Sequence, residues 1–575
     1  MTFKIFRRKR GTNTFVDPDE IFLDSTNIQN FDRQQFEGRI EKPIPRKTIN
    51  FLGASFILIA LIFGTRLVHL QIKNGDIYRQ RSENNTLEKI NIFTERGIIY
   101  DRNGHELAWN KKVDIGEGSP NLNETSNKNL SYLRTYMTPG FSHVLGYVSY
   151  PTKDSKGNYW QTNFIGKDGL EKEYNDTIKG ENGSKIIETN AQGVVYSENV
   201  INMPKRGGDL KTTIDSKIQK ELFTLIKELS KSNNFTGGSG IMMDINSGEI
   251  IASTSFPEYD SEILSLGKDV KKIREYLNDK KKPFLDRTVS GLYTPGSIVK
   301  PFFALGALAE GVIDQYKQIL STGSISIPNP YFPDQKTTFK DWRANGWTDM
   351  REAIAVSSDI YFYAVGGGFE DQKGLGIVNI EKYARIFGFG EKTGVDLPDE
   401  ISGTIPSPEW KLLNFKGDPW RIGDTFNTSI GQYGFQVTPI EMTRAVGAIA
   451  NYGKLVTPHL IKDDKEKENR YRIVDLPKEY FDVIHEGMRM AVTNGTASVL
   501  NVPFVDVAVK TGTAQIGISK NKVNSWVMGF MPYENPKYAF TIMMEAGPTT
   551  NNVSASTIMR GLLDWMYVYA PEYLK

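Results

Sequence analysis

The sequence contains no cysteine and only five histidines among its 575 residues. A chain without thiols cannot rely on disulfides, so its composition is compatible with either a reducing or an oxidising compartment. The histidines stand at positions 69, 105, 143, 459 and 485 with no metal-ligand spacing, so we expect no zinc site. The formal net charge is only +2, which gives no strong overall field for binding nucleic acid.

Composition is otherwise ordinary for a folded protein, with 39% hydrophobic and 24% charged residues. The length allows two to four domains. The sequence shows no internal repeat and no long low-complexity tract. A multidomain globular protein is therefore expected.

One apolar run stands near the start, INFLGASFILIALIFGTRLV at residues 49–68. It follows a basic flank and lies too far from the first residue for a typical cleavable signal peptide. We predict a cytoplasmic basic tail over residues 1–48, a single uncleaved membrane helix over residues 49–70, and export of the remainder. A buried helix is the alternative, because the most apolar part, Phe51–Thr65, is short for a span. Residues 17–35 are polar and are predicted to be disordered.

The exported part contains several local signals. Residues 67–81 continue the helix, residues 95–108 form a hairpin around Asp101-Arg-Asn-Gly104, and residues 111–129 are a polar loop. Residues 211–229 change from a strand to an amphipathic helix, and residues 238–256 read as a second hairpin. From there to residue 575, helical and strand-like segments mix without regular βαβ alternation. This predicts an α+β domain of about 360 residues.

The stretch TPGSIVKP places Ser297 and Lys300 at the start of an apolar helix. Residues three apart share one helix face, so the Lys amine can reach the Ser hydroxyl. A serine becomes a nucleophile when a nearby base takes its proton. Ser-x-x-Lys alone is weak, because it also occurs at Ser265 and at Ser519, and a Ser at this place could merely cap the helix. The turn residues before Ser297 favour the catalytic interpretation.

A second motif, Ser357-Ser-Asp359, lies in an apolar and aromatic segment. Taken by itself it is better explained as a helix cap. Alternating valines at positions 505, 507 and 509 predict a strand that ends in a third motif, Lys510-Thr511-Gly512-Thr513. A strand edge with a cation, hydroxyls and a Gly can dock an extended peptide and hold its carboxylate. The triplet Lys-Thr-Gly also occurs at Lys392, but no strand is predicted before it, so we do not assign that copy to catalysis.

The three motifs in this order are typical of penicillin-binding proteins and β-lactamases. The chain resembles a class B penicillin-binding protein, a membrane-anchored peptidoglycan D,D-transpeptidase. Further stretches are similar to that family: RGIIYDRNG, GKDGLEKEYN, MMDINSGEIIAS, FGFGEKTGVDLPDE, SIGQYGFQVTPIEM and NSWVMGFMP. Asp359, where most of the family has Asn, resembles the elongation branch, penicillin-binding protein 2.

The resemblance implies an elongated, mostly-β membrane-proximal pedestal (dimerisation-like) domain over residues 71–211. It implies a penicillin-binding, β-lactamase-like transpeptidase domain over residues 212–575. Ser297 would be acylated by a D-Ala–D-Ala stem peptide, with Lys300 as its base and Asp359 fixing Lys300.

Further roles follow from the same resemblance. Ser357 would relay a proton to the leaving D-alanine. Lys510 would supply positive charge near the substrate carboxylate, and Thr511, Gly512 and Thr513 would line its binding site. The N–H groups of Ser297 and Thr513 would form the oxyanion hole. No cofactor is implied, and β-lactams would acylate the same serine.

The family resemblance also implies partners. The glycosyltransferase module of bifunctional relatives is absent, so a SEDS (RodA-like) glycosyltransferase and other elongation-complex proteins are expected. The family usually has a longer folded insert between Gly104 and His143, where this sequence has a short polar loop.

Three alternatives to this reading stay open. They are a septal class B transpeptidase, a non-catalytic wall scaffold or β-lactam sensor, and a hydrolase acting as carboxypeptidase or β-lactamase.

Overall fold

The structure is a computed structural model that describes residues 45–76, 87–112, 132–155, 159–189, 195–332, 334–462, 464–517 and 519–575. The chain divides into two compact units, residues 1–88 and residues 89–575. The disorder predicted for residues 17–35 lies outside the described residues, as do residues 77–81 of the predicted helix and residues 113–129 of the predicted loop.

The first unit contains one long helix, α1 (Arg46–Val68), which continues as a π-helical turn, η3 (His69–Lys73). Its large apolar side chains, among them Phe51, Phe56 and Phe63, are exposed all along the helix. Among the described residues it is the one helix long and apolar enough to cross a membrane. It begins at Arg46 rather than at Ile49, directly after Pro45, whose backbone is extended.

The second unit begins with small sheets. One has the strand order β1 (Leu87–Ile92), β9 (Gly183–Thr189), β10 (Val195–Asn202), and another the order β11 (Leu210–Lys211), β2 (Ile99–Tyr100), β3 (Glu106–Lys112), β4 (Tyr132–Tyr136). Two ladders pair β5 (Val148–Ser149) with β8 (Ile165–Gly166), and β6 (Thr152–Lys153) with β7 (Tyr159–Gln161). Short helices α3 (Ser142–Leu145), α4 (Gly169–Glu173) and α5 (Asn175–Ile178) lie among them. The predicted hairpin at Asp101–Gly104 is confirmed, because β2 and β3 pair antiparallel across it.

A buried charge cluster holds this strand-rich region together. The fully buried carboxylate of Glu171 accepts hydrogen bonds from the guanidinium groups of Arg96 and Arg134, the latter at 2.7 Å. Burial alone would raise the pKa of Glu171, but the two guanidinium groups outweigh it and hold that pKa below its usual value. The cluster joins the segment before β2 to β4 and α4.

The remainder of the unit is built on a five-stranded antiparallel sheet. Its strand order is β13 (Ile250–Phe256), β12 (Gly237–Asp244), β22 (Tyr538–Pro548), β21 (Lys522–Met531), β20 (Ala508–Ile516). The predicted hairpin over residues 238–256 is confirmed as β12 and β13. The sheet thus joins two hairpin strands to three strands that come more than 250 residues later, and β20 forms one of its edges.

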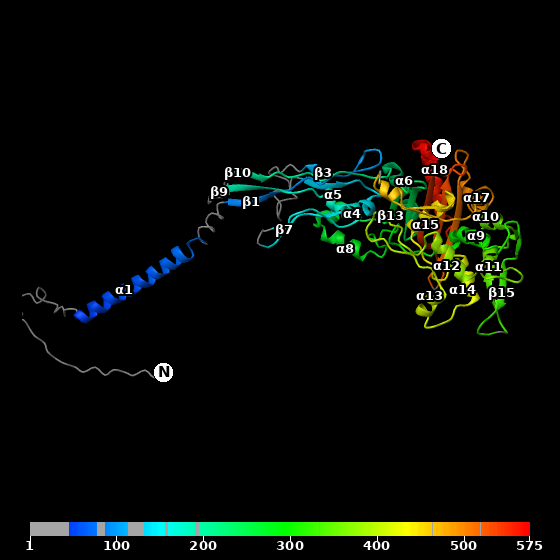
Figure 1. Cartoon of the computed structure of the whole chain (residues 1–575), viewed down its shortest axis with the longest axis horizontal. Coiled ribbons are helices and arrows are strands. Elements are labelled where there is room, and N and C mark those ends of the chain that lie inside the picture. The colour runs from blue at the N-terminus through cyan, green and yellow to red at the C-terminus, as the bar shows by residue number, and fades with distance from the viewer. Residues whose placement is uncertain are drawn as a thin grey trace, which may run out of the picture. The chain divides into compact units, whose positions relative to one another are not determined.

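Side chains alternate between the two faces of the sheet. On β21, Trp526, Met528 and Phe530 join one hydrophobic core, while Val527 and Met531 join another. The second core is covered by α6 (Ser216–Ser232) and α18 (Ala555–Tyr569), which lie side by side (Figure 1). The predicted amphipathic helix is confirmed as α6, with Ile218, Leu222 and Ile226 buried.

The first core is covered by a layer of helices that includes η4 (Gly296–Val299), α9 (Lys300–Ala309), α10 (Met350–Ala355), α11 (Asp359–Gly367), α15 (Pro439–Ala450) and α17 (Lys478–Thr493). Two further helices, α12 (Gly376–Ile386) and α14 (Ile422–Ser429), contribute to this core. Elsewhere, α7 (Ser261–Leu266) contacts β4, β5 and α8 (Val270–Asn278), while η5 (Ser498–Leu500) and η6 (Pro571–Leu574) contact α18. Two short helices complete the set, α13 (Pro408–Asn414) and α16 (Lys465–Glu468). Three small ladders pair β14 (Ile319–Ser321) with β17 (Gly346–Thr348), β15 (Ser324–Pro328) with β16 (Lys336–Lys340), and β18 (Lys454–Val456) with β19 (Tyr471–Ile473). The fold class is therefore α+β, as the sequence predicted.

The strand-rich region and the five-stranded sheet share a hydrophobic core and polar contacts. Ile99 and Leu170 pack in one cluster with Ile241. Ser216, at the first turn of α6, donates its hydroxyl to Asp101 at 2.6 Å. The RGIIYDRNG stretch is thus part of the junction between the two regions.

The Glu171 cluster gives a stability prediction. Glu171→Ala removes the carboxylate that two buried guanidinium groups share, and loss of one partner from a buried ion pair costs about 3–5 kcal/mol. We expect the free energy of unfolding in urea to fall by an amount of that order. The control is Glu181→Ala, which breaks the exposed pair with Lys205 and is expected to leave the unfolding midpoint unchanged. Equal effects of the two substitutions would contradict the stabilising role of the cluster.

Candidate active site

Ser297 lies in the short 3-10 helix η4, immediately before the buried helix α9. Gly296 has a φ of +60°, which L-residues rarely adopt, and its N–H donates to the carbonyl of Gly431 at 3.0 Å. Among the described residues, no hydrogen bond involves Ser297 Oγ, and the side chain faces a cleft. The predicted helix start is correct in outline, but Ser297 occupies the 3-10 turn and Lys300 is the first α-helical residue.

Lys300 is fully buried beneath this turn. Its Nζ donates to Asp359 Oδ1 at 2.6 Å and to the carbonyl oxygen of Ser357 at 2.9 Å, and lies 3.5 Å from Ser357 Oγ. It also lies over the ring of Phe362, 5.4 Å from its centroid. Burial with this many partners fixes the amine in one place beside the cleft.

Ser357 lies in the tight turn between α10 and α11, and Asp359 is the first residue of α11. Ser357 has a φ of +58°, a left-handed conformation that costs a non-glycine residue roughly 1–2 kcal/mol. Ser358 caps α11 by accepting the N–H of Tyr361 at 3.4 Å. The N-cap of α11 is therefore Ser358, the middle residue of the motif. This leaves the side chains of Ser357 and Asp359 free to meet the lysines.

Lys510 reaches the same serine from the sheet. It lies on the edge strand β20, is fully buried, and donates to Ser357 Oγ at 2.8 Å and to the carbonyl of Thr511 at 2.8 Å. The predicted strand is β20, which runs from Ala508 to Ile516, so it begins later than Val505 and continues three residues beyond Thr513. The alternating valines before it reflect burial of Val505 and Val507 in the segment leading into the strand.

Burial also decides the charge of Lys510. Loss of solvent and then the nearby charge of Lys300 hold the pKa of Lys510 well below its usual value, and the carboxylate of Asp359 partly offsets them. Ser357 Oγ accepts from Lys510, so its own proton remains available for donation. The serine hydroxyl is therefore placed to pass a proton between a lysine and a group in the cleft.

The cleft has a volume of about 400 Å³. It is lined by Ser297, Trp342, Ser357, Asp359, Thr496, Thr511, Gly512, Thr513, Ser525, Trp526 and Ser554. All eight residues that the sequence analysis selected thus come together, six on the cleft wall and Lys300 and Lys510 directly behind it. Gly512 is needed there, because a Cβ atom would approach Ile298 and the carbonyl of Pro295 to 2.9 Å.

Sequence reasoning missed several residues of the cleft wall. Thr496 pairs with Thr511 through their hydroxyls at 2.7 Å, and Ser525 Oγ accepts the N–H of Ala555 at 3.0 Å. Ser525 lies in the NSWVMGFMP stretch that resembles the family, and that stretch is the one sequence signal for its place in the cleft. Trp342 and Ser554 stand in loops with no local signal, because only tertiary folding brings them to the cleft.

The second Lys-Thr-Gly triplet lies elsewhere, as the sequence context predicted. Thr393 donates both its N–H and its hydroxyl to Glu400, and the carbonyl of Gly394 accepts from Lys467. None of the three residues lines the cleft. Across the part of the chain that the structure describes, no group of His, Asp or Glu side chains is arranged to hold a metal ion.

Comparison with known proteins agrees with this geometry. Residues 238–564 match the family described as penicillin binding protein transpeptidase domain, and residues 125–212 match the penicillin-binding protein dimerisation domain. Peptidoglycan D,D-transpeptidase MrdA of Haemophilus influenzae is 29% identical, with 90% of this chain and 91% of that protein covered. MrdA of Escherichia coli K12 is 28% identical over 91% of this chain and 94% of the relative.

Solved structures with the same fold include PBP2 of Pseudomonas aeruginosa in complex with WCK 5153, with a TM-score of 0.68 and 28% identity, covering 85% of this chain and 98% of that one. PBP2 of Helicobacter pylori in its complex with MreC gives a TM-score of 0.67 and 28% identity, covering 84% and 99%. A chain from a peptidoglycan synthase complex gives 0.68 and 26%, covering 92% and 98%. The protein belongs to the penicillin-binding protein transpeptidase family, and within it to the class B, PBP2 type.

The contact between Gly431 and Gly296 gives a prediction about the site. A Cβ atom on Gly431 would lie 2.2 Å from the carbonyl oxygen of Gly296, so Gly431→Ala must displace the residue before Ser297. We expect labelling by a fluorescent penicillin to slow by about tenfold or more, because small displacements of reacting groups are costly.

The matched control for this substitution is Gly417→Ala. Gly417 has a similar φ of +82°, against +76° for Gly431, but a Cβ atom there would meet nothing within 4 Å. It therefore reproduces the backbone strain without the collision. Equal labelling rates for the two variants would show that the contact does not position Ser297.

Proposed function

We propose that this protein is a peptidoglycan D,D-transpeptidase of the elongation type, which cross-links stem peptides through an acyl-enzyme on Ser297. The observation that carries the proposal is the meeting of Lys300 and Lys510 at Ser357, on the wall of the cleft that Ser297 faces. The names of the MrdA relatives support the same reaction.

In the first step, Ser297 Oγ attacks the carbonyl carbon between the two D-alanines of a stem peptide, while Lys300 in its neutral form takes the serine proton. A C–O bond forms to the serine. The C–N bond to the terminal D-alanine then breaks, and Ser357 passes a proton to the leaving amine. Lys300 reprotonates Ser357, so the proton that left Ser297 is transferred to the product.

The second step reverses these roles. The amine of a neighbouring stem peptide attacks the acyl-enzyme carbonyl, its proton passes to the Ser357 and Lys300 pair, and Ser297 leaves with a proton. A new peptide bond forms and the serine is regenerated. We assign the oxyanion hole to the N–H groups of Ser297 and Thr513.

The edge strand β20 would hold the substrate. We assign the peptide carboxylate to Thr511 and Thr513, with Lys510 behind them. The negative charge of the bound carboxylate would offset the lowered pKa of Lys510 and favour its protonated form, so that Lys300 is the amine that accepts the proton of Ser297. Gly512 supports this assignment, because its lack of a side chain lets the turn that bears Ser297 approach the strand. An edge strand also offers unpaired backbone groups to an extended peptide.

We further assign the membrane span to α1, with a cytoplasmic N-terminus because the basic residues precede the apolar run. The pedestal would cover residues 71–211 and the exported transpeptidase domain residues 212–575. The MreC complex and the peptidoglycan synthase complex among the solved relatives support elongation-complex partners, including a RodA-like glycosyltransferase. β-Lactams would acylate Ser297.

The experiment that tests the proposal is intact-protein mass spectrometry after incubation with benzylpenicillin. We expect the wild type to gain the mass of one penicillin and Ser297→Ala to gain none, because the nucleophile is absent. The matched control is Ser519→Ala, which alters another Ser-x-x-Lys motif that is exposed and does not line the cleft, and it should keep the adduct.

Other outcomes would overturn parts of the proposal. A persistent adduct on Ser297→Ala would place the nucleophile elsewhere. An adduct on the wild type that disappears while opened penicillin accumulates would indicate a hydrolase. No adduct on any form would support a non-catalytic scaffold.

A further inference from the structure

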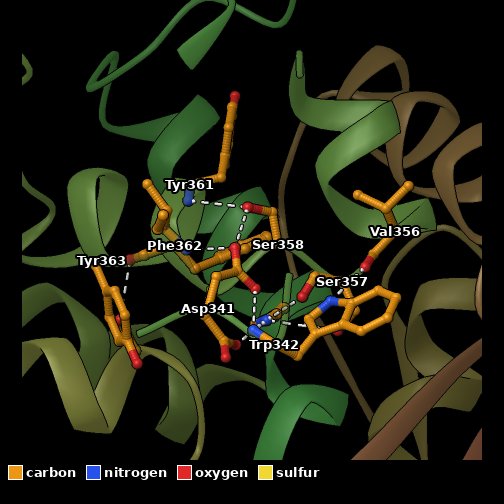
Figure 2. Close-up of polar contacts among 12 residues, drawn as sticks. Asp341, Trp342, Val356, Ser357, Ser358, Tyr361, Phe362 and Tyr363 are labelled. Carbon is orange, nitrogen blue, oxygen red and sulfur yellow. Dashed lines mark hydrogen bonds and ion pairs between the residues drawn. The ribbon is translucent and has the colours of Figure 1, made fainter. Parts of the chain in front are cut away.

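The carboxylate of Asp341 lies behind the Ser357–Asp359 turn, at the end of strand β16 (Figure 2). Its Oδ2 accepts the hydroxyl of Ser358 at 2.9 Å and the N–H of Ile360 at 3.2 Å. These donors flank Asp359 on both sides. A single carboxylate oxygen therefore holds the two residues on either side of the one that pairs with Lys300, Ser358 by its side chain and Ile360 by its backbone.

The same carboxylate is itself held in place. Its Oδ2 also accepts from Ser321 Oγ at 3.1 Å and from Asn345 Nδ2 at 3.2 Å, and Oδ1 accepts the N–H of Trp342 at 2.8 Å. The contacts come from β14 and from the loop between β16 and β17. Asp341 is thus fixed to the framework outside the turn and cannot simply follow the turn if it moves.

Trp342, the next residue, contacts the other end of the same turn. The indole Nε1 of Trp342 donates to the carbonyl of Val356 at 3.1 Å, and the ring lines the cleft (Figure 2). The Asp341–Trp342 pair therefore contacts the turn before Ser357 and after it. Asp341 is not among the residues that line the cleft.

We propose that Asp341 is a positioning residue for the transpeptidase reaction, which holds the Ser357–Asp359 turn so that Ser357 and Asp359 meet the two lysines. The inference rests on the proposed function of the Ser297 site. Its role is needed because Ser357 is in an unfavourable left-handed conformation, which persists only where the surroundings fix it. Without the carboxylate, the N–H of Ile360 in the first turn of α11 and the hydroxyl of Ser358 both lose their acceptor.

Loss of the Asp341 carboxylate should lower the acylation rate constant without changing the noncovalent affinity for a β-lactam. Asp341 does not touch the cleft, so the noncovalent affinity for a β-lactam should stay within about twofold of the wild type. The acylation rate constant should fall about 10- to 100-fold in Asp341→Ala, because Lys300 and Ser357 lose their alignment. Asp341→Asn keeps an oxygen acceptor for Ser358 and Ile360 and should recover most of the rate.

The test is stopped-flow acylation of the full-length protein by nitrocefin. The dependence of the observed rate on nitrocefin concentration gives the dissociation constant and the acylation rate constant separately. The fraction of protein that becomes acylated is measured as well, so that misfolded protein is not counted as slow protein. Ser358→Ala, which deletes one of the two contacts and leaves Asp341 in place, serves as a milder variant should Asp341→Ala not fold.

The matched control is Ser321→Ala, which removes a framework partner of the same carboxylate oxygen but no contact to the turn. It should acylate at the wild-type rate. Full acylation rates in both Asp341→Ala and Ser358→Ala would overturn the inference while leaving the proposed function intact. A wild type that is not acylated at all would instead refute the proposed function.

Discussion

Two buried lysines, Lys300 and Lys510, meet at the hydroxyl of Ser357, and among the described residues Asp359 is the one carboxylate bonded to either. Two ammonium groups this close, away from water, are unfavourable unless one loses its proton or finds a counter-charge. The site uses both solutions, since Asp359 pairs with Lys300 and the pKa of Lys510 lies well below its usual value. Lys510 therefore loses its proton more easily than a free lysine, and the hydroxyl of Ser357 lies between the two amines, where it can carry a proton from one to the other.

The rest of the fold keeps these groups in contact. Lys300 comes from the helical layer and Lys510 from the edge of the sheet, so the distance between them depends on how closely the layers approach. Gly512 allows the turn containing Ser297 to lie against the strand, and Gly431 allows a loop to support Gly296. On the far side, Asp341 fixes the strained turn that supplies Ser357 and Asp359.

Much of this was accessible from the sequence because its signals are local. The hairpins around Asp101 and Asp244, the amphipathic helix α6 and the three motifs each depend on residues close together in the chain. The limits of β20 were not accessible from the sequence, because pairing with β21 extends the strand beyond the segment of alternating valines. Asp341 and Trp342 were also missed, since a polar residue in a loop gives no sign that it will face an active-site turn.

The most direct test of this charge arrangement is the pH dependence of the acylation rate constant in Asp359→Asn beside the wild type. The carboxylate of Asp359 raises the pKa of Lys510, so its removal should lower that pKa further. Lys510 would then take up its proton at a lower pH, and the account predicts that the inflection of the rate profile shifts to lower pH. An inflection that stays in place or moves to higher pH would contradict the coupling of the three charges.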